Sequence, residues 1–155
     1  METTLEKRLT KESKWIFEKY KNIAMEYNNE NPDYTLHLST TIKGKKLTFL
    51  ISPNYPFRAP AMQVNGVDYI QLLSFSFPEL QEYLGKINKP CLCCSTLLCS
   101  NNWKPGVKLM NVINEYEEIR EIIVKCLYKK YTRIVCNHFN IFAEELVENI
   151  IKYIN

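Results

Sequence analysis

Apolar side chains recur at helical spacing over the first part of the chain, and charged residues, chiefly lysine and glutamate, separate them. The segment therefore has one apolar stripe and one charged face, which predicts a long amphipathic helix. The stripe consists of Leu5, Leu9, Ile16, Tyr20, Ile23 and Tyr27. Turn-forming residues and a proline follow at 28–32, and they predict that the helix ends there.

The next segments have the composition of strands. Residues 34–41 and 46–52 are rich in threonine, leucine, isoleucine and phenylalanine, and Lys43-Gly44-Lys45 between them predicts a hairpin turn. Residues 61–67 predict a third strand, although Asn65-Gly66 interrupts it and itself favours a turn. Together they predict an antiparallel meander.

Helical patterns return in the second half. Pro78 to Leu84 predict a short helix with proline in its first turn and Gly85 at its end. Residues 108–124 predict a strong helix that 126–131 extend, and 137–154 predict a last one. The stripe of that last helix is Phe139, Phe142, Leu146, Ile150 and Tyr153. The order of elements predicts an α+β fold: an N-terminal helix, an antiparallel meander of three to four strands, and C-terminal helices.

Length and composition set the broad class. The chain has 155 residues, 46% of them hydrophobic, which predicts one folded domain over 1–155 with a helical extension at about 125–155. A net charge of +3, spread along the chain, does not favour nucleic acid as a partner. The sequence has neither an apolar secretion signal nor an apolar run of about 18 residues, so we expect no membrane partner and a cytoplasmic or nuclear location.

Cysteine is the residue type that points to chemistry. Four of the six cysteines, Cys91, Cys93, Cys94 and Cys99, stand close together, and Trp103 follows them. In a reducing compartment such thiols are metal ligands, nucleophiles or small buried apolar groups. The third reading suits Cys93 and Cys99, and Trp103 is predicted to pack beneath the loop.

A structural zinc site is a weaker hypothesis for the same segment. Cys91, Cys94 and Cys99 would supply three ligands, but neither His37 nor His138 is near them in sequence to supply a fourth. A second pair of cysteines at the usual knuckle spacing is also missing.

Three segments, in this order, resemble the ubiquitin-conjugating enzyme family. They are the basic start of the first helix, Lys7-Arg8-Leu9-Thr10-Lys11-Glu12; the turn Tyr55-Pro56-Phe57-Arg58-Ala59-Pro60; and the cysteines followed by Asn102-Trp103-Lys104-Pro105. The resemblance covers about Leu5 to Ile123. It departs from the family twice. No His-Pro-Asn is present, since Ile70-Gln71-Leu72 follow the tyrosine at its expected place, and an insertion at about 73–86 lengthens the route to the cysteines.

The resemblance implies a carrier that accepts ubiquitin or a ubiquitin-like modifier from an activating enzyme as a cysteine thioester and passes it to a lysine or a ligase cysteine. A thiolate suits both steps because it is a good nucleophile and a good leaving group. No cofactor is implied. The family's roles fall on Cys94, with Cys91 second, as nucleophile; Asn102 or Asn88 as oxyanion or loop support; Phe57 and Pro105 toward the ligase; and Lys7, Arg8 and Lys11 toward the activating enzyme. The alternatives are a catalytically inactive ubiquitin-binding variant of this fold and a zinc-stabilised interaction domain.

Overall fold

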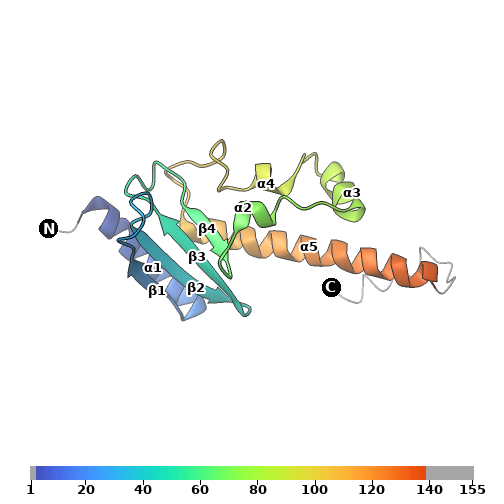
Figure 1. Ribbon diagram of the computed structural model, residues 1–155, viewed down its shortest axis with the longest axis horizontal. Helices are drawn as coiled ribbons and strands as arrows, with labels where there is room; N and C mark the ends of the chain where they lie inside the picture. The colour runs from blue at the N-terminus through green and yellow to red at the C-terminus, as the bar shows by residue number, and fades with distance from the viewer. Residues whose placement is uncertain (1–2, 139–155) are drawn as a thin grey trace. The chain divides into compact units, whose positions relative to one another are not determined.

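The computed structural model describes residues 3–138 (Figure 1). These residues group into two compact units. Of the described residues, unit 1 comprises 3–75 and 92–115, and unit 2 comprises 76–91 and 116–138. The last predicted helix, 137–154, lies outside the described residues except for Asn137 and His138, which belong to α5. No helix between residues 3 and 138 has the length and apolar content needed to cross a membrane.

Unit 1 begins with α1 (Thr4–Tyr20), whose N-terminus is closed by a capping box between Thr3 and Glu6. The helix buries Leu9, Glu12 and Ile16. It ends at Lys21, which has a left-handed backbone with φ 59°. The predicted helix through Tyr27 was therefore too long.

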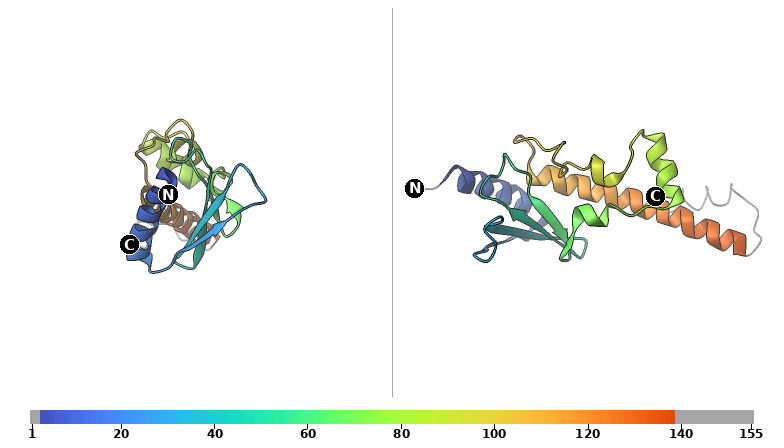
Figure 2. Two further views of the ribbon diagram at one scale, coloured as in Figure 1. Left: turned by 90° about the vertical axis from the view of Figure 1, so that its left-hand side faces the viewer. Right: turned by 45° about the horizontal axis from the view of Figure 1, so that its top comes forward.

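A five-stranded antiparallel sheet with the order β1-β2-β3-β4-β5 follows α1, so the α+β prediction is confirmed, although the sheet has five strands where three to four were predicted. Its strands are β1 (Ala24–Tyr27), β2 (Leu36–Ile42), β3 (Lys45–Ile51), β4 (Ala61–Val64) and β5 (Val67–Asp68). Alternate side chains of β2 and β3 are buried, as a sheet covered on one face requires. Figure 2 shows α1 against a face of this sheet.

Two tight turns set the register of the meander. Lys43 and Gly44 have φ values of 48° and 76°, and they join β2 to β3 where the hairpin was predicted. Asn65 and Gly66, with φ values of 50° and 82°, turn β4 into β5. Positive φ at both central positions is the geometry that suits a two-residue hairpin. The predicted third strand is thus two strands with the suspected turn between them.

Three helical segments complete unit 1. They are α2 (Tyr69–Leu72), α4 (Leu92–Ser95) and the first turns of α5 (Leu109–His138). Leu109, Val112 and Ile113 at the start of α5 are fully buried. The core of unit 1 is therefore built from α1, the inner face of the sheet and the beginning of α5.

Unit 2 contains α3 (Pro78–Lys86) and the rest of α5. Pro78 stands in the first turn of α3 as predicted, and the helix ends one residue beyond Gly85. Lys129 of α5 pairs with Glu82 of α3 at 3.1 Å, and Arg133 pairs with Glu79 at 3.5 Å. Hydrogen bonds from Lys86 and Lys129 lower the pKa of Glu82 to about 2. The predicted insertion at 73–86 thus contains a regular helix.

Candidate functional site

Two segments of unit 1 meet at Trp103. They are the proline turn, residues 55–60, and the cysteine segment, residues 93–105. The indole Nε1 of Trp103 donates a hydrogen bond to the carbonyl oxygen of Pro56 at 2.6 Å. The rings of Tyr55 and Trp103 lie 6.0 Å apart between centroids, and both side chains are buried. The two segments that the sequence singled out are therefore neighbours, and Trp103 packs in the core as predicted.

A buried carboxylate, that of Glu12, holds the first residue of the proline turn, Tyr55. Glu12 of α1 is only 2% exposed, and it accepts hydrogen bonds from the Tyr55 hydroxyl at 2.9 and 3.0 Å. It also accepts from Arg8 Nε at 2.7 Å and from the backbone N–H of Leu109 at 2.8 Å. Burial, followed by the charge of Glu12, raises the pKa of Tyr55, so the phenol stays protonated as the donor. One side chain thus joins α1, the turn and α5.

Two further side chains hold the cysteine segment itself. Glu115 of α5 accepts from Thr96 Oγ1 at 2.7 Å and from the backbone N–H of Leu97 at 3.0 Å. The side-chain amide Nδ2 of Asn102 donates to the carbonyl oxygens of Cys94 and Thr96, both at 2.9 Å. These bonds bind the segment from Cys94 to Asn102 into one fixed loop.

Asn102 had two predicted roles, and its geometry fits only loop support. An asparagine amide has two N–H groups, and both are used here on backbone carbonyls. The amide of Asn102 is therefore not available to stabilise an oxyanion in this conformation.

The cysteines of unit 1 differ in exposure. Cys94 is exposed at the end of α4, whereas Cys93 and Cys99 are partly covered. The sulfur atoms of Cys93 and Cys94 lie 3.9 Å apart. Cys99 contributes its backbone carbonyl, which accepts from the N–H groups of Asn102 and Trp103. Cys94 is therefore the thiol of unit 1 that an incoming protein reaches most directly.

Cys91 and Asn88 belong to unit 2. The Cys91 side chain is partly exposed. Asn88 follows α3 with a φ of 53°, a left-handed conformation that asparagine adopts more readily than most residues. Asn88 thus has a local role in ending the turn after α3.

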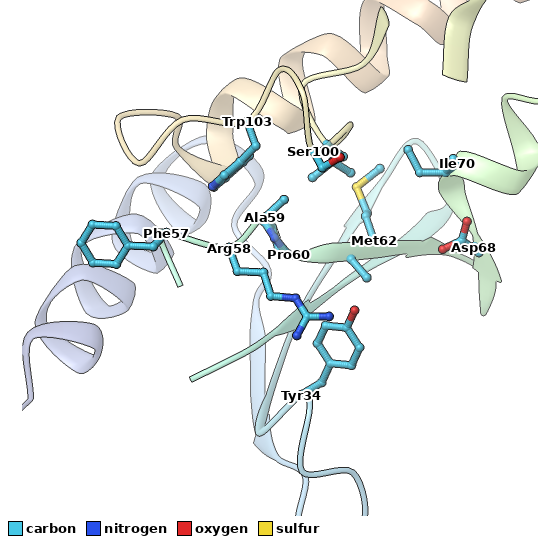
Figure 3. Close-up of a pocket in the computed structure, with 12 residues that line it drawn as sticks. Tyr34, Phe57, Arg58, Ala59, Pro60, Met62, Asp68, Ile70, Ser100 and Trp103 are labelled. Atoms are coloured by element: carbon cyan, nitrogen blue, oxygen red, sulfur yellow. The ribbon is translucent and has the colours of Figure 1, made fainter. Parts of the chain in front are cut away.

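A cavity of about 420 Å³ opens beside the proline turn (Figure 3). Its lining includes Pro60, Met62, Ile70 and Trp103, with Arg58 and Tyr34 at one side. The Arg58 guanidinium lies 5.7 Å from the centre of the Tyr34 ring. Most residues that line the cavity are apolar, and its polar groups are the Arg58 guanidinium, the Asp68 carboxylate and the hydroxyls of Tyr34 and Ser100.

The residues predicted to face a ligase are both exposed. Phe57 is 82% exposed and points away from the other residues that line the cavity (Figure 3). Pro105 is exposed two residues after Trp103. An aromatic side chain held in water on a proline turn has the character of an interface anchor.

The three basic residues of α1 separate into two groups. Lys7 and Lys11 are exposed, and Lys11 Nζ lies 5.3 Å from the ring centre of Trp15. Arg8 is turned inward, where it pairs with Glu12 and donates to the carbonyl oxygen of Val107 at 2.8 Å. Its guanidinium also lies 5.1 Å from the centre of the Tyr55 ring. Arg8 therefore holds unit 1 together, whereas Lys7 and Lys11 are available to a partner.

The organising carboxylates were not singled out from sequence. Glu12 is one of the charged residues of the predicted helix, but it lies three residues after Leu9 and four residues before Ile16, on the same helix face as both. The spacing of three and four residues from these two apolar positions was the available signal that Glu12 is buried. Glu115 had the same signal, because it lies three residues after Val112 and four residues before Ile119, although other acidic residues surround it in the sequence.

Comparisons of the chain with protein-family models, with curated proteins and with solved structures find no match.

Proposed function

We propose that this chain is a thioester carrier that takes ubiquitin or a ubiquitin-like modifier from an activating enzyme onto Cys94. The observation that carries the proposal is an exposed thiol in a loop that is fixed by Asn102 and Glu115, next to the Trp103–Pro56 hydrogen bond. The order of motifs that resembles the ubiquitin-conjugating enzyme family supports the same conclusion, as does the α+β fold.

The proposed step is a transfer between two sulfur atoms. The Cys94 thiolate attacks the carbonyl carbon of the modifier's terminal glycine, which is bound as a thioester to a cysteine of the activating enzyme. A new carbon–sulfur bond forms, the old one breaks, and the activating enzyme's thiolate leaves. The reaction needs neither metal nor organic cofactor.

The onward transfer is proposed to favour a ligase cysteine over a lysine. The sequence lacks His-Pro-Asn, and both amide N–H groups of Asn102 are used within the loop. Losing one oxyanion donor typically costs about 10²–10³ in rate. A thiolate attacks a thioester with less need of such help than an amine does, because it is the better nucleophile at neutral pH.

Partners are assigned by exposure. Lys7 and Lys11 would meet the activating enzyme, and Phe57 with Pro105 would meet the ligase. An inactive ubiquitin-binding variant would use the same surfaces without the covalent step, and a zinc-stabilised domain would use the thiols as ligands.

The first prediction separates these three functions. The chain is incubated with activating enzyme, ATP and ubiquitin or a related modifier, and the products are resolved without reductant. We expect an adduct one modifier heavier that dithiothreitol removes. Cys94→Ala is expected to abolish it, because the acceptor sulfur is gone, and Cys91→Ala, the matched control, is expected to retain it.

Three other outcomes would contradict loading on Cys94. An adduct that persists in Cys94→Ala and disappears in Cys91→Ala would move the acceptor to Cys91. Binding of the modifier without any reductant-sensitive adduct would support the inactive variant. Stoichiometric zinc in purified protein that unfolds on chelation would support the zinc-stabilised domain.

A further inference from the structure

Two thiols stand next to each other at the end of α4. The Sγ atoms of Cys93 and Cys94 are 3.9 Å apart, so the sulfurs are nearly in contact although no disulfide joins them. Cys94 is exposed, and Cys93 is partly covered. The carrier function requires one sulfur and gives no role to the second.

We propose that Cys93 and Cys94 form a reversible oxidation site in which Cys93 captures oxidised Cys94 as a disulfide between adjacent residues. The regulatory consequence, that oxidation stops modifier loading, rests on the proposed function. The oxidation itself does not, because it needs only the two thiols and a peroxide.

The chemistry has two balanced steps. The Cys94 thiolate attacks one oxygen of hydrogen peroxide, the O–O bond breaks, and Cys94 becomes a sulfenic acid while hydroxide leaves and takes up a proton. The Cys93 thiolate then attacks the Cys94 sulfur, the S–O bond breaks, and a second hydroxide leaves as water. Two thiols lose two electrons in total, and one peroxide is reduced to two waters.

Exposure determines which thiol reacts first. Oxidation by peroxide follows thiolate character and access, and Cys94 is the exposed member of the pair. By contrast, Cys126 and Cys136 are buried, and burial raises the pKa of the Cys126 thiol. These two residues therefore remain reduced under mild treatment.

Because Cys93 and Cys94 are adjacent in sequence, a disulfide between them should be easy to reduce. Disulfides usually join residues whose Cα atoms are about 4.4–6.8 Å apart, whereas adjacent residues are held at about 3.8 Å by the peptide bond. A disulfide between neighbours is consequently strained, and strained disulfides have more oxidising potentials. We therefore expect glutathione to restore both thiols, and capture by Cys93 to protect Cys94 from irreversible oxidation to the sulfinic acid.

The experiment uses the full chain, fully reduced and then treated with hydrogen peroxide at a small molar excess. Remaining thiols are alkylated and counted by intact mass, and the peptide containing both residues is mapped. We expect the count to fall by two from six, with that peptide two hydrogens lighter and glutathione reversing both changes. Cys93→Ser is expected to stop at a sulfenic acid that dimedone traps on Cys94. Cys99→Ser, the control, removes another partly covered cysteine, and this variant is expected to form the same disulfide as the natural chain.

Three results would overturn the proposal. In the first, all six thiols of the natural chain are still alkylated after peroxide treatment. In the second, the disulfide maps to a pair other than Cys93 and Cys94. In the third, the Cys93→Ser protein gives no dimedone adduct. Thioester loading of the reduced protein is measured separately. A protein that forms the disulfide but never loads a modifier would refute the carrier function alone, whereas one that loads normally but forms no disulfide would refute the oxidation site alone.

Discussion

At the scale of single residues, Glu12 organises unit 1. It is a carboxylate almost without solvent contact that accepts hydrogen bonds from Tyr55, Arg8 and the backbone of Leu109. A buried charge is tolerated when it is paired and its remaining lone pairs are satisfied, and both conditions are met here. The proline turn therefore takes its position from a residue 43 positions before it in the chain.

The second prediction concerns this carboxylate. Glu12→Ala leaves the Arg8 guanidinium and the Tyr55 hydroxyl without their shared acceptor, so we expect it to cost about 3–5 kcal/mol in the free energy of unfolding. Glu18→Ala, an exposed position of the same helix, is the control, and we expect a change within about 0.5 kcal/mol. Denaturant unfolding monitored by tryptophan fluorescence measures both variants. A Glu12→Ala cost as small as the control's would show that the network contributes little.

Single residues also show the limit of sequence reasoning. Phe57 is exposed and Trp103 is buried, as predicted. Phe57 stands in a proline-rich turn, which tends to lie at the surface, and Trp103 has a large apolar ring that favours burial. The inward position of Arg8 does not follow from local sequence, because its partners lie in other segments, such as Val107. A basic residue among other charged residues of a helix gives the same sequence pattern whether its side chain is exposed or turned inward.

At the scale of elements, composition and turn residues predicted strands β2 and β3 better than periodicity predicted the end of the first helix. The stripe of α1 continues in sequence through Ile23 and Tyr27, but the helix stops at Lys21, and residues 24–27 pair with β2 instead. Asn22 accounts for the change of direction, since its side chain donates to the Tyr20 and Thr41 carbonyls. Pairing with a neighbouring strand thus overrides a helical pattern.

The loop from Cys94 to Asn102 is the element on which catalysis would depend. Its backbone is held by side chains rather than by regular structure, and Asn102 makes two of those bonds. Positioning of this kind matters because small displacements of a reacting group reduce rate strongly.

The third prediction tests that element. Asn102→Ala removes both donors, so we expect faster hydrogen exchange in residues 94–102 and a loss of about 1–3 kcal/mol in stability. Asn101→Ala, the exposed neighbour, is the matched control and should leave exchange unchanged. Thioester loading in Asn102→Ala should slow without disappearing, because Cys94 is still present. Unchanged exchange in the loop would contradict a supporting role for Asn102.

At the scale of the whole molecule, the class of fold followed from the order of patterned segments, but function does not follow from fold. A helix, an antiparallel meander and further helices can serve many activities, and the particular site has to supply the chemistry. The sequence alone identified three parts of this site, namely the cysteines, Trp103 and the proline turn. What it could not show was which groups the carboxylates of Glu12 and Glu115 bind, because Tyr55 lies 43 residues from Glu12 and Leu97 lies 18 residues from Glu115 in the chain.

The last prediction concerns how the chain, if it carries a modifier as proposed, would pass that modifier on. With no His-Pro-Asn, and with Asn102 committed to its loop, nothing identified in the site prepares an amine to attack. An amine with a pKa of about 10.4 is nearly all protonated at pH 7, whereas a thiol with a pKa of about 8.5 is a few per cent thiolate. Purified thioester should therefore discharge faster to the amino acid cysteine than to lysine. Discharge to lysine should rise about tenfold per pH unit between pH 7 and 9, as the neutral amine becomes available. Equal rates for the two acceptors at pH 7, measured by loss of the adduct, would instead require a group in the site that activates lysine.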